Sequence, residues 1–343
     1  MRVRITQIDG KLPNLALMAL AHHHRSLGDD VYFTRRVRRD MFEGSYDRVY
    51  ASAIFGFSTT RLDRFCKQWP DAIIGGTGTK ESVTVEQITG QNRLDYDYSI
   101  YPDYTPSIGF TQRGCRLKCK FCVVPQKEGK NRHERTIADI WRGPGHPKKL
   151  HLLDNDFFGQ PEDDWRQKIR EIQDGGFKIC LNQGINVRLI DDATAEAMAS
   201  VEYRDDQFQQ RRLYTAWDNL KDEKIFFRGI DTLERHGIPP KHVMVYMLIG
   251  YDPKETWDRI LHRFDAMVAR GVMPYPMVYN NVRKDLKAFQ RWAVTGLYRA
   301  VPWEDYRGPV SREAIAASKA SPPLLGLIDL PEPVQLELEA GDG

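Results

Sequence analysis

Three cysteines lie close together at Cys115, Cys119 and Cys122, in the spacing CxxxCxxC. Thiolates this close in one loop can converge on a single metal centre. A structural zinc site normally takes four protein ligands, and the nearest further candidate, His133, lies eleven residues beyond Cys122. Three thiolates instead suit an iron–sulfur cube whose fourth iron stays open for a small molecule. The array therefore predicts a metal centre with one open position.

Strand-like segments alternate with helical stretches from Ser107 onward. The six expected strands are residues 108–112, 149–153, 177–181, 212–216, 242–249 and 275–279. Repeated βα units predict parallel strands, and six of them predict a partial, open barrel whose active site lies at the carboxyl ends of the strands. The cysteine array follows the first strand, so it is expected at that end.

Polar side chains follow the second and third of these strands. Carboxylates and an amide after the second strand can accept hydrogen bonds from an ammonium group, although an Asx turn could use one of them. After the third strand, two amides and a guanidinium suit a carboxylate and ribose hydroxyls. A structural, salt-bridged arginine is the alternative there. These residues are Asp154, Asn155 and Asp156, then Gln183, Asn186 and Arg188.

The first hundred residues also alternate strand and helix, which predicts a parallel sheet with helices on both faces. We expect a Rossmann-like domain at 1–95, a tyrosine-rich linker at 96–106, the barrel at 107–283, and a helical extension with a tail at 284–343. The fold class is thus α/β throughout. Gly75–Gly78 closes a strand of the first domain, where it either admits a ligand to the backbone or forms a plain turn.

The cysteine spacing, with the aromatic Phe121 just before the last thiol, resembles the signature of the radical S-adenosylmethionine (SAM) superfamily. The resemblance implies a TIM-type barrel and a [4Fe-4S] cluster whose open iron binds SAM. In that superfamily a Gly-Gly-Glu stretch usually follows the second strand, and Asp154–Asp156 stands in its place here without the glycines. The resemblance also implies an electron-donor protein such as flavodoxin or ferredoxin.

The later strand ends add further expected contacts under this resemblance. Asp218 is expected to reach a ribose, and the stretch 245–255 is similar to the superfamily's adenine-binding segment. The residues that the resemblance assigns to SAM are Phe121, Asp154, Asn155, Asp156, Gln183, Asn186, Arg188, Asp218, Ile249, Gly250 and Tyr251. Tyr279 and Asn280, after the sixth strand, are expected to contact a small-molecule or nucleotide-type substrate.

Segments 13–31, 50–54 and 73–78 look like the cobalamin-binding-like Rossmann domain that precedes the barrel in one group of radical-SAM proteins. In that group the domain either holds cobalamin or only covers the active site. No DxHxxG loop follows the first strand here, so a histidine-ligated cobalamin is not expected. Cobalamin bound without that histidine remains an alternative, because a fold does not specify its ligand.

Two conspicuous runs have ordinary structural explanations. His22, His23 and His24 fan out by about 100° each on a helix, so they cannot all face one metal; a solvated face with one partly buried ring is expected. The basic run 34–39 could meet phosphates of a nucleic acid. Without interleaved aromatic residues it is expected to be a solvated loop, so nucleic acid is not the favoured partner.

Composition sets broad limits. The 343 residues carry 50 Lys and Arg against 47 Asp and Glu, a net charge of +3 that does not by itself indicate nucleic acid. The sequence has no apolar run long enough for a membrane span and no signal-peptide pattern at its start, so we expect a cytoplasmic protein without a membrane partner. Five cysteines, three of them clustered, fit a reducing compartment.

These features together predict an enzyme that cleaves SAM reductively to a 5′-deoxyadenosyl radical. The radical abstracts hydrogen from an unidentified substrate, in a rearrangement or a C–H functionalisation. Two alternatives stay open: a cobalamin-dependent radical-SAM methyltransferase, and a non-catalytic iron–sulfur module that binds nucleic acid or protein. Cys66 and Cys180 lie apart from the array and are expected to be buried small side chains. Two such cysteines argue against the auxiliary cluster of sulfur-inserting relatives.

Overall fold

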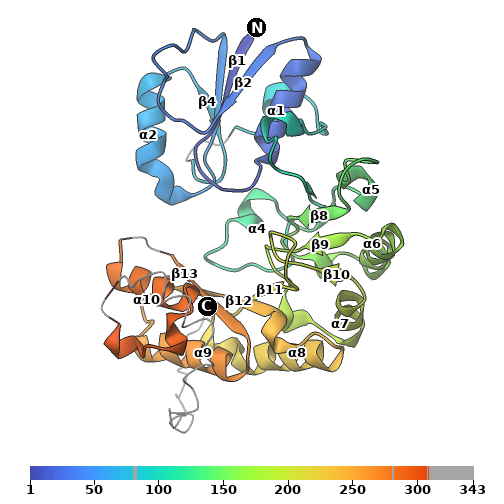
Figure 1. The fold of residues 1–343 in the computed structure, drawn as a ribbon, viewed down its shortest axis with the longest axis vertical. Coiled ribbons are helices and arrows are strands. Elements are labelled where there is room, and N and C mark those ends of the chain that lie inside the picture. Colours follow the sequence, from blue (N-terminus) through green and yellow to red (C-terminus); the bar gives the residue numbers. More distant parts are fainter. Residues whose placement is uncertain (80–82, 280–281, 307, 309–343) are drawn as a thin grey trace. The chain divides into compact units, whose positions relative to one another are not determined.

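The computed structural model describes residues 1–79, 83–279, 282–306 and 308, and the chain divides into two compact units, Met1–Cys180 and Leu181–Gly343 (Figure 1). The division falls inside the segment expected to be one barrel domain. The domain boundaries expected from the sequence therefore stay a prediction. Residues 309–343, which include the expected tail, lie outside the described residues.

The first unit begins with a parallel four-stranded sheet in the order β2-β1-β3-β4. Its strands are β1 (Arg2–Gln7), β2 (Asp30–Thr34), β3 (Arg48–Ser52) and β4 (Ile73–Gly75). The main helices between them are α1 (Leu15–Ser26) and α2 (Thr59–Gln68), and a short α3 (Val85–Thr89) follows. The strand–helix alternation of the sequence therefore predicts this parallel sheet correctly.

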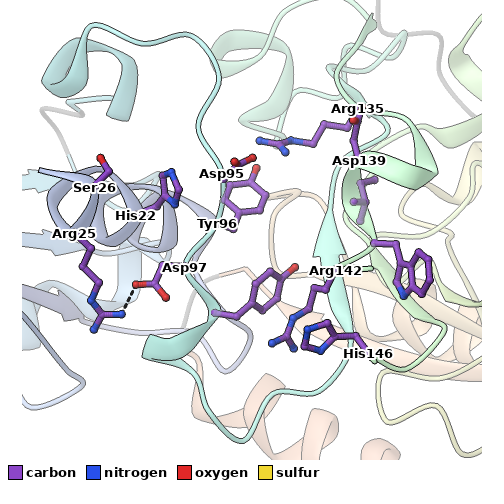
Figure 2. A pocket seen from close by; sticks show the side chains of 13 residues that line it. His22, Arg25, Ser26, Asp95, Tyr96, Asp97, Arg135, Asp139, Arg142 and His146 are labelled. Carbon is purple, nitrogen blue, oxygen red and sulfur yellow. Dashed lines mark hydrogen bonds and ion pairs between the residues drawn. The ribbon is translucent and has the colours of Figure 1, made fainter. Parts of the chain in front are cut away.

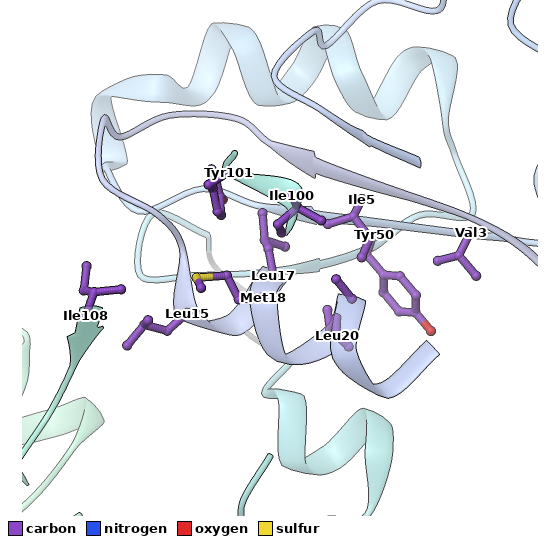
Figure 3. Packing of buried hydrophobic residues seen from close by; sticks show 11 residues of the cluster. Val3, Ile5, Leu15, Leu17, Met18, Leu20, Tyr50, Ile100, Tyr101 and Ile108 are labelled. Carbon is purple, nitrogen blue, oxygen red and sulfur yellow. The ribbon is translucent and has the colours of Figure 1, made fainter. Parts of the chain in front are cut away.

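Side chains of successive β1 residues point to opposite faces of the sheet, and each face has its own core. On one face, Val3 and Ile5 pack with Leu17 and Met18 of α1 (Figure 3). On the other face, Phe65 of α2 joins a second cluster that includes Ile8 and Ala51. The two helices thus cover opposite faces, as expected of a doubly wound sheet.

The start of α1 is fixed by a side chain. Asn14 accepts a hydrogen bond from the Leu17 backbone N–H at 3.2 Å, which satisfies one of the free donors of the first turn. The Asn14 amide donates in turn to the Ser52 hydroxyl at 2.8 Å. The cap therefore also ties the helix to the carboxyl end of β3.

A second parallel sheet in the first unit contains β5 (Ser107–Gly109), β8 (Lys149–Leu152) and β9 (Lys178–Cys180). Around it lie a short hairpin of β6 (Gln112–Arg113) and β7 (Arg132–His133), and the helices α4 (Val124–Lys127), α5 (Ile137–Ile140) and α6 (Glu162–Gly175). The expectation of one strand over 108–112 is wrong: β5 ends at Gly109, and Gln112 pairs with His133 instead. The backbone N–H groups of Thr111 and Gln112 bond to the Asp154 carboxylate, which ends the pairing with β8.

The second unit holds a parallel three-stranded sheet of β11 (Leu213–Ala216), β12 (Val243–Ile249) and β13 (Met273–Val278). Its helices are α7 (Asp192–Ala199), α8 (Glu223–Arg235), α9 (Trp257–Ala269) and α10 (Lys284–Val294), and β10 (Glu202–Tyr203) is a short strand. One face of α10 is apolar and buries Leu286, Phe289, Trp292 and Ala293.

The other five expected strands are present with small shifts at their ends, and both units are α/β with parallel sheets. A continuous six-stranded partial barrel stays a prediction, because β11, β12 and β13 form a sheet of their own. Within the described part of the chain, no helix combines the length and apolarity that a bilayer span requires.

The glycine cluster after β4 offers a test of the first sheet. Gly76 has φ +103°, and a Cβ there would lie 2.2 Å from the Ala53 carbonyl oxygen. Gly28 also has positive φ, at +80°, but a Cβ there would meet nothing within 4 Å. We expect Gly28→Ala to cost about 1–2 kcal/mol from the left-handed backbone alone. Gly76→Ala should cost about 1–3 kcal/mol more, because the backbone of β3 must move. Urea denaturation of both variants measures the difference, and equal losses would contradict the close packing.

Candidate functional site

The three cysteines of the array lie in the loop that joins β6 to β7. All three are half-buried. The Cys122 backbone N–H donates to the Cys119 carbonyl at 3.0 Å, which closes a tight turn between these two residues. Among the residues that the structure describes, no three His, Cys, Asp or Glu side chains gather as a metal site. The thiols thus share one loop, and a cluster would have to draw them together.

The base of the cysteine loop is closed by backbone contacts. Gly114 has φ +86°, and a Cβ there would lie 2.4 Å from the Lys130 carbonyl oxygen, so the two ends of the loop touch. The Gly114 N–H donates to Glu128 at 3.0 Å, and the Cys115 N–H donates to the Gly129 carbonyl at 3.3 Å. These contacts fix where the loop leaves the hairpin.

The polar residues after β8 hold this loop in place. Asp154 is buried and accepts hydrogen bonds from the Thr111 hydroxyl at 2.6 Å and the Gln112 N–H at 2.6 Å. Asp156 is buried as well and pairs with the Arg116 guanidinium at 2.9 Å. The structure therefore uses these predicted SAM contacts as anchors for the segment around Cys115, and their role toward SAM stays a prediction.

Asn155 lies between these two carboxylates and contacts the far side of the loop. Its amide donates to the Glu128 carboxylate at 3.1 Å, and the same carboxylate receives the Gly114 N–H. All three residues after β8 thus bind the cysteine loop. Phe121, also predicted to contact the cofactor, is half-buried within that loop.

Burial governs the protonation of the buried groups here. It raises the pKa of Asp154 to about 6, although the donors from Thr111 and Gln112 act against it. Burial also raises the pKa of the Cys115 thiol, and the nearby Asp156, Cys119 and Cys122 raise it further. The Leu117 N–H, 3.4 Å from the Cys115 sulfur, lowers it. Metal ligation requires the thiolate, so a bound cation would supply the charge that favours this form.

The residues around the array fit a thiolate-bound cluster in their chemistry. Three cysteines in one loop are the donor set of such a cluster with one open position. Among the described residues, the Gln112 side-chain amide is fully buried and forms no hydrogen bond, and neither does the Asn131 amide oxygen. Gln112 precedes Cys115 by three residues, so an amide donor lies near the ligands in the chain.

In the second unit, Arg188 pairs with Asp222 at 2.9 Å and donates to the Asn186 amide oxygen at 3.1 Å. This is the salt-bridged arginine that the sequence left open as an alternative. Gln183 is exposed, and its amide donates to the neighbouring Asn182 side chain at 3.4 Å. The structure thus joins Asn186 with Arg188, and a ligand carboxylate would compete with Asp222.

The carboxyl ends of β11 and β12 are joined by a buried charge network. Asp218 accepts the Leu248 N–H at 3.0 Å, and burial raises the pKa of its carboxyl. Arg263 of α9 is 1% exposed and donates to the Trp217 carbonyl at 3.0 Å, the Leu248 carbonyl at 3.0 Å and the Glu255 carboxylate. Glu255 also accepts the Gly250 N–H at 2.7 Å.

Sequence reasoning missed Arg263. It occupies the apolar stripe of α9 together with Ile260, Phe264 and Met267, all of them buried. An arginine at a core position of an amphipathic helix needs partners at depth. That mismatch in the sequence could have identified Arg263. Its contacts fix the strand ends that carry Asp218 and Gly250.

The residues of the predicted adenine-binding segment differ in their burial and in their contacts. Ile249 is fully buried, so its side chain belongs to the core. The Tyr251 and Tyr279 rings meet edge to face with centroids 4.9 Å apart, which brings a predicted SAM residue beside a predicted substrate residue. Tyr279 is 56% exposed. Asn280 lies outside the described residues.

The arginines of the basic run are exposed as expected, but the histidine run is more buried than expected, because His24 is buried and His22 and His23 are half-buried. His24 is buried between Asp29, at 2.7 Å from Nδ1, and the Tyr50 hydroxyl, at 3.1 Å from Nε2. Arg36 pairs with Asp40 at 3.1 Å, and Arg39 donates to the carbonyl oxygens of residues 43 and 44. Arg36 and Arg39 thus have partners within the chain.

The expected ligand edge of the first sheet is filled by the chain itself. In a sheet of this order, ligands bind where the strand order reverses, between β1 and β3. There the Tyr101 hydroxyl donates to the Gln7 amide oxygen at 2.9 Å and accepts the Asn14 N–H at 3.1 Å. Gly78 donates its N–H to the Ala53 carbonyl at 2.9 Å, which is the plain-turn alternative for the glycine cluster.

Comparison with known proteins gives one partial similarity. The chain is 25% identical over 203 residues to the tRNA-2-methylthio-N(6)-dimethylallyladenosine synthase of Sulfurihydrogenibium sp. (strain YO3AOP1). The match covers 54% of this chain and 46% of that protein, so the chain spans about half of its relative's length. No protein-family model and no solved structure matches the chain. The similarity supports an enzyme of the radical-SAM superfamily, and it does not test the first domain.

The Arg263 network can be tested by a double-mutant cycle. Arg263→Met and Glu255→Met should each lower the free energy of unfolding by about 3–5 kcal/mol, because each leaves a buried charge without its partner. The double variant should lose clearly less than the sum of the two losses. The exposed pair of Arg283 and Asp285, at 2.5 Å in the same unit, is the control, and Arg283→Met should cost less than about 1 kcal/mol. Additive losses at 263 and 255 in urea denaturation would show that the two residues are not coupled.

Proposed function

We propose that the chain is a radical-SAM enzyme in which Cys115, Cys119 and Cys122 hold a [4Fe-4S] cluster. The observation that carries this proposal is the CxxxCxxC array in a loop after the first strand of a series of βα units. The similarity to a tRNA-2-methylthio-N(6)-dimethylallyladenosine synthase over 203 residues also supports it. When bound, the cluster and SAM supply reductive cleavage to a 5′-deoxyadenosyl radical, which abstracts hydrogen from the substrate.

The chain's own part is to position and enclose the reacting groups. Asp154 and Asp156 hold the segment around Cys115 against the end of β8, so the thiols start from a fixed base. The Leu117 N–H contacts the Cys115 sulfur and would stay available to stabilise a thiolate. A loop fixed at both ends can close around a cluster without rearranging the sheet below it.

We propose the strand ends of the second unit for SAM and substrate. Tyr251 and Tyr279 form a ring pair that suits a base or an aromatic substrate. Gln183, Asn186 and Arg188 offer amides and a guanidinium to a carboxylate or ribose, in exchange for the Asp222 contact. Asp218 and Gly250 would act through the backbone geometry that Arg263 and Glu255 maintain.

The electron donor proposed for this reaction has an acidic surface, as a flavodoxin or a ferredoxin would. Lys118 and Lys120 alternate with the cysteines of the array, and both side chains are exposed. Exposed cations beside a redox centre favour the encounter with an anionic partner. Because Arg116 is already paired with Asp156, the two lysines are the candidates for this contact.

The relative's name favours a second candidate, methylthio transfer to RNA. Beyond the array, this sequence contains Cys66 and Cys180. Cys180 is fully buried on β9, and burial raises the pKa of Cys66 on α2. The two do not form a second thiol triad, so we favour hydrogen abstraction that leads to rearrangement or functionalisation. Cobalamin-dependent methylation is less favoured, because the crevice between β1 and β3 is filled by the chain's own side chains.

Replacement of one array cysteine tests the central claim. After anaerobic reconstitution, the wild-type protein should carry about four irons per chain and release 5′-deoxyadenosine when reduced with SAM. Cys119→Ala should lose most of the iron and all of the cleavage. Cys66→Ala is the matched control outside the array and should keep both.

Iron and SAM cleavage retained in Cys119→Ala would refute the cluster assignment. Iron without any SAM cleavage in the wild-type protein would instead favour the non-catalytic binding module. A visible spectrum of the anaerobically purified protein separates the enzyme alternatives, because cobalamin has absorption bands that an iron–sulfur cube lacks.

A further inference from the structure

An open groove of about 630 Å³ lies in the first unit, and no residue of the cysteine loop lines it. Figure 2 shows α1 on one side, with His22, Arg25 and Ser26, and the segment from Arg135 to His146 on the other. The chain from Asp95 to Tyr98 runs between them. The volume lies within the range of small-molecule sites, roughly 300–1,000 Å³.

Two of the groove's cations have no carboxylate partner among the described residues. Arg135 is 6% exposed and donates to the Leu94 carbonyl. Arg142 donates only to the carbonyl oxygens of Tyr104 and Thr105, at 3.4 and 3.5 Å. Carbonyl groups satisfy the N–H donors but leave the positive charge unbalanced. An anionic ligand would supply the missing charge.

The groove also contains acidic side chains, two of which are paired with arginines. Arg25 pairs with Asp97, and Asp139 pairs with Arg93 at 3.0 Å. Asp95 also lines the groove. These acidic side chains would repel a long run of negative charges, so they favour a ligand that presents one phosphate group at a time.

Aromatic rings accompany the two unbalanced cations. The Arg135 guanidinium lies 4.5 Å from the Tyr96 ring centroid, and the Arg142 guanidinium lies 4.1 Å from the Tyr98 centroid. Trp141 also lines the groove, and its buried indole N–H forms no hydrogen bond among the described residues. Guanidinium groups that match a phosphate, next to aromatic rings that can stack on a base, form a typical nucleotide-binding combination.

We propose that this groove binds a nucleoside phosphate, either as a free nucleotide or as one residue of an RNA strand. Arg142 and Arg135 would contact the phosphate, and the Tyr96, Tyr98 and Trp141 side chains would contact the base or sugar. The site is distinct from the cysteine loop, and the proposal does not depend on SAM cleavage. A peptide carboxylate is the less suitable occupant, because it brings no planar base to the aromatic rings that line the groove.

The proposal is tested by binding to the purified full-length chain, with AMP in calorimetry and a labelled short oligoadenylate in fluorescence anisotropy. The wild-type protein should bind at least one of the two probes saturably. Arg142→Gln should weaken that binding about tenfold, as expected for one charge-assisted contact, and Arg142→Lys should weaken it less. Arg166→Gln is the matched control, because Arg166 also stacks on an aromatic ring, Trp165, at 4.6 Å but lies on α6 outside the groove.

The two probes separate the sources of the phosphate. Binding of AMP alone identifies a free nucleotide, and binding of the oligoadenylate alone identifies an RNA strand; either supports the site. If circular dichroism shows that Arg142→Gln is unfolded, Trp141→Phe replaces it, since it keeps a ring against Phe177 and removes the N–H donor together with part of the indole. That variant should weaken binding several-fold.

Three results would overturn the proposal. Neither probe binds the wild-type protein; the Arg142→Gln or Trp141→Phe variant binds as tightly as wild type; or a polyglutamate peptide displaces the probes more effectively than inorganic phosphate does. Each binding measurement omits reductant and SAM. A failure of SAM cleavage therefore does not affect the binding result, and a failure of binding does not affect the SAM-cleavage result.

Discussion

The carboxylates of Asp154 and Asp156 hold the cysteine loop against the end of β8. Asp154 takes the backbone N–H groups of Thr111 and Gln112, and this ends the pairing of β5 and turns the chain into the β6–β7 hairpin. Asp156 binds Arg116, which stands between the first two cysteines. The chain can direct three thiols from one loop only because two buried acids fix where that loop begins.

The same contacts explain what the sequence could and could not predict. The strands were predictable because their apolar runs alternate with helical stretches of suitable length, and β12 and α10 lie close to where the pattern puts them. The residues at the strand ends were also predictable by type and place. Their hydrogen-bond partners could not be predicted, because a short polar side chain can accept hydrogen bonds from nearby backbone N–H groups or from a ligand equally well.

Buried arginines were the clearest failure of sequence reasoning. Arg4 on β1 is fully buried, pairs with Glu43 at 2.6 Å and lies 4.8 Å from the Trp69 ring centroid. Arg263 on α9 has the corresponding role in the second unit. Arg263 interrupts the apolar stripe of α9, so that anomaly is visible in the sequence. Arg4 is not visible in this way, because Arg2 and Thr6 on the same face of β1 are also polar. The partners are not visible in either case, because Glu43 and Glu255 come from loops whose path depends on the finished fold.

The first sheet shows why a fold alone does not identify a ligand site. Its strand order puts the usual binding crevice between β1 and β3, and the chain fills that crevice with Gln7, Asn14 and Tyr101. Tyr101 belongs to the same segment that carries Tyr96 and Tyr98 along the other side of α1. A segment that closes one face of the domain thus lines an open groove elsewhere. Beside its half-buried tyrosine rings lie two guanidinium groups for which no described residue supplies a carboxylate, so the case for a ligand is stronger at that groove than at the strand crossover.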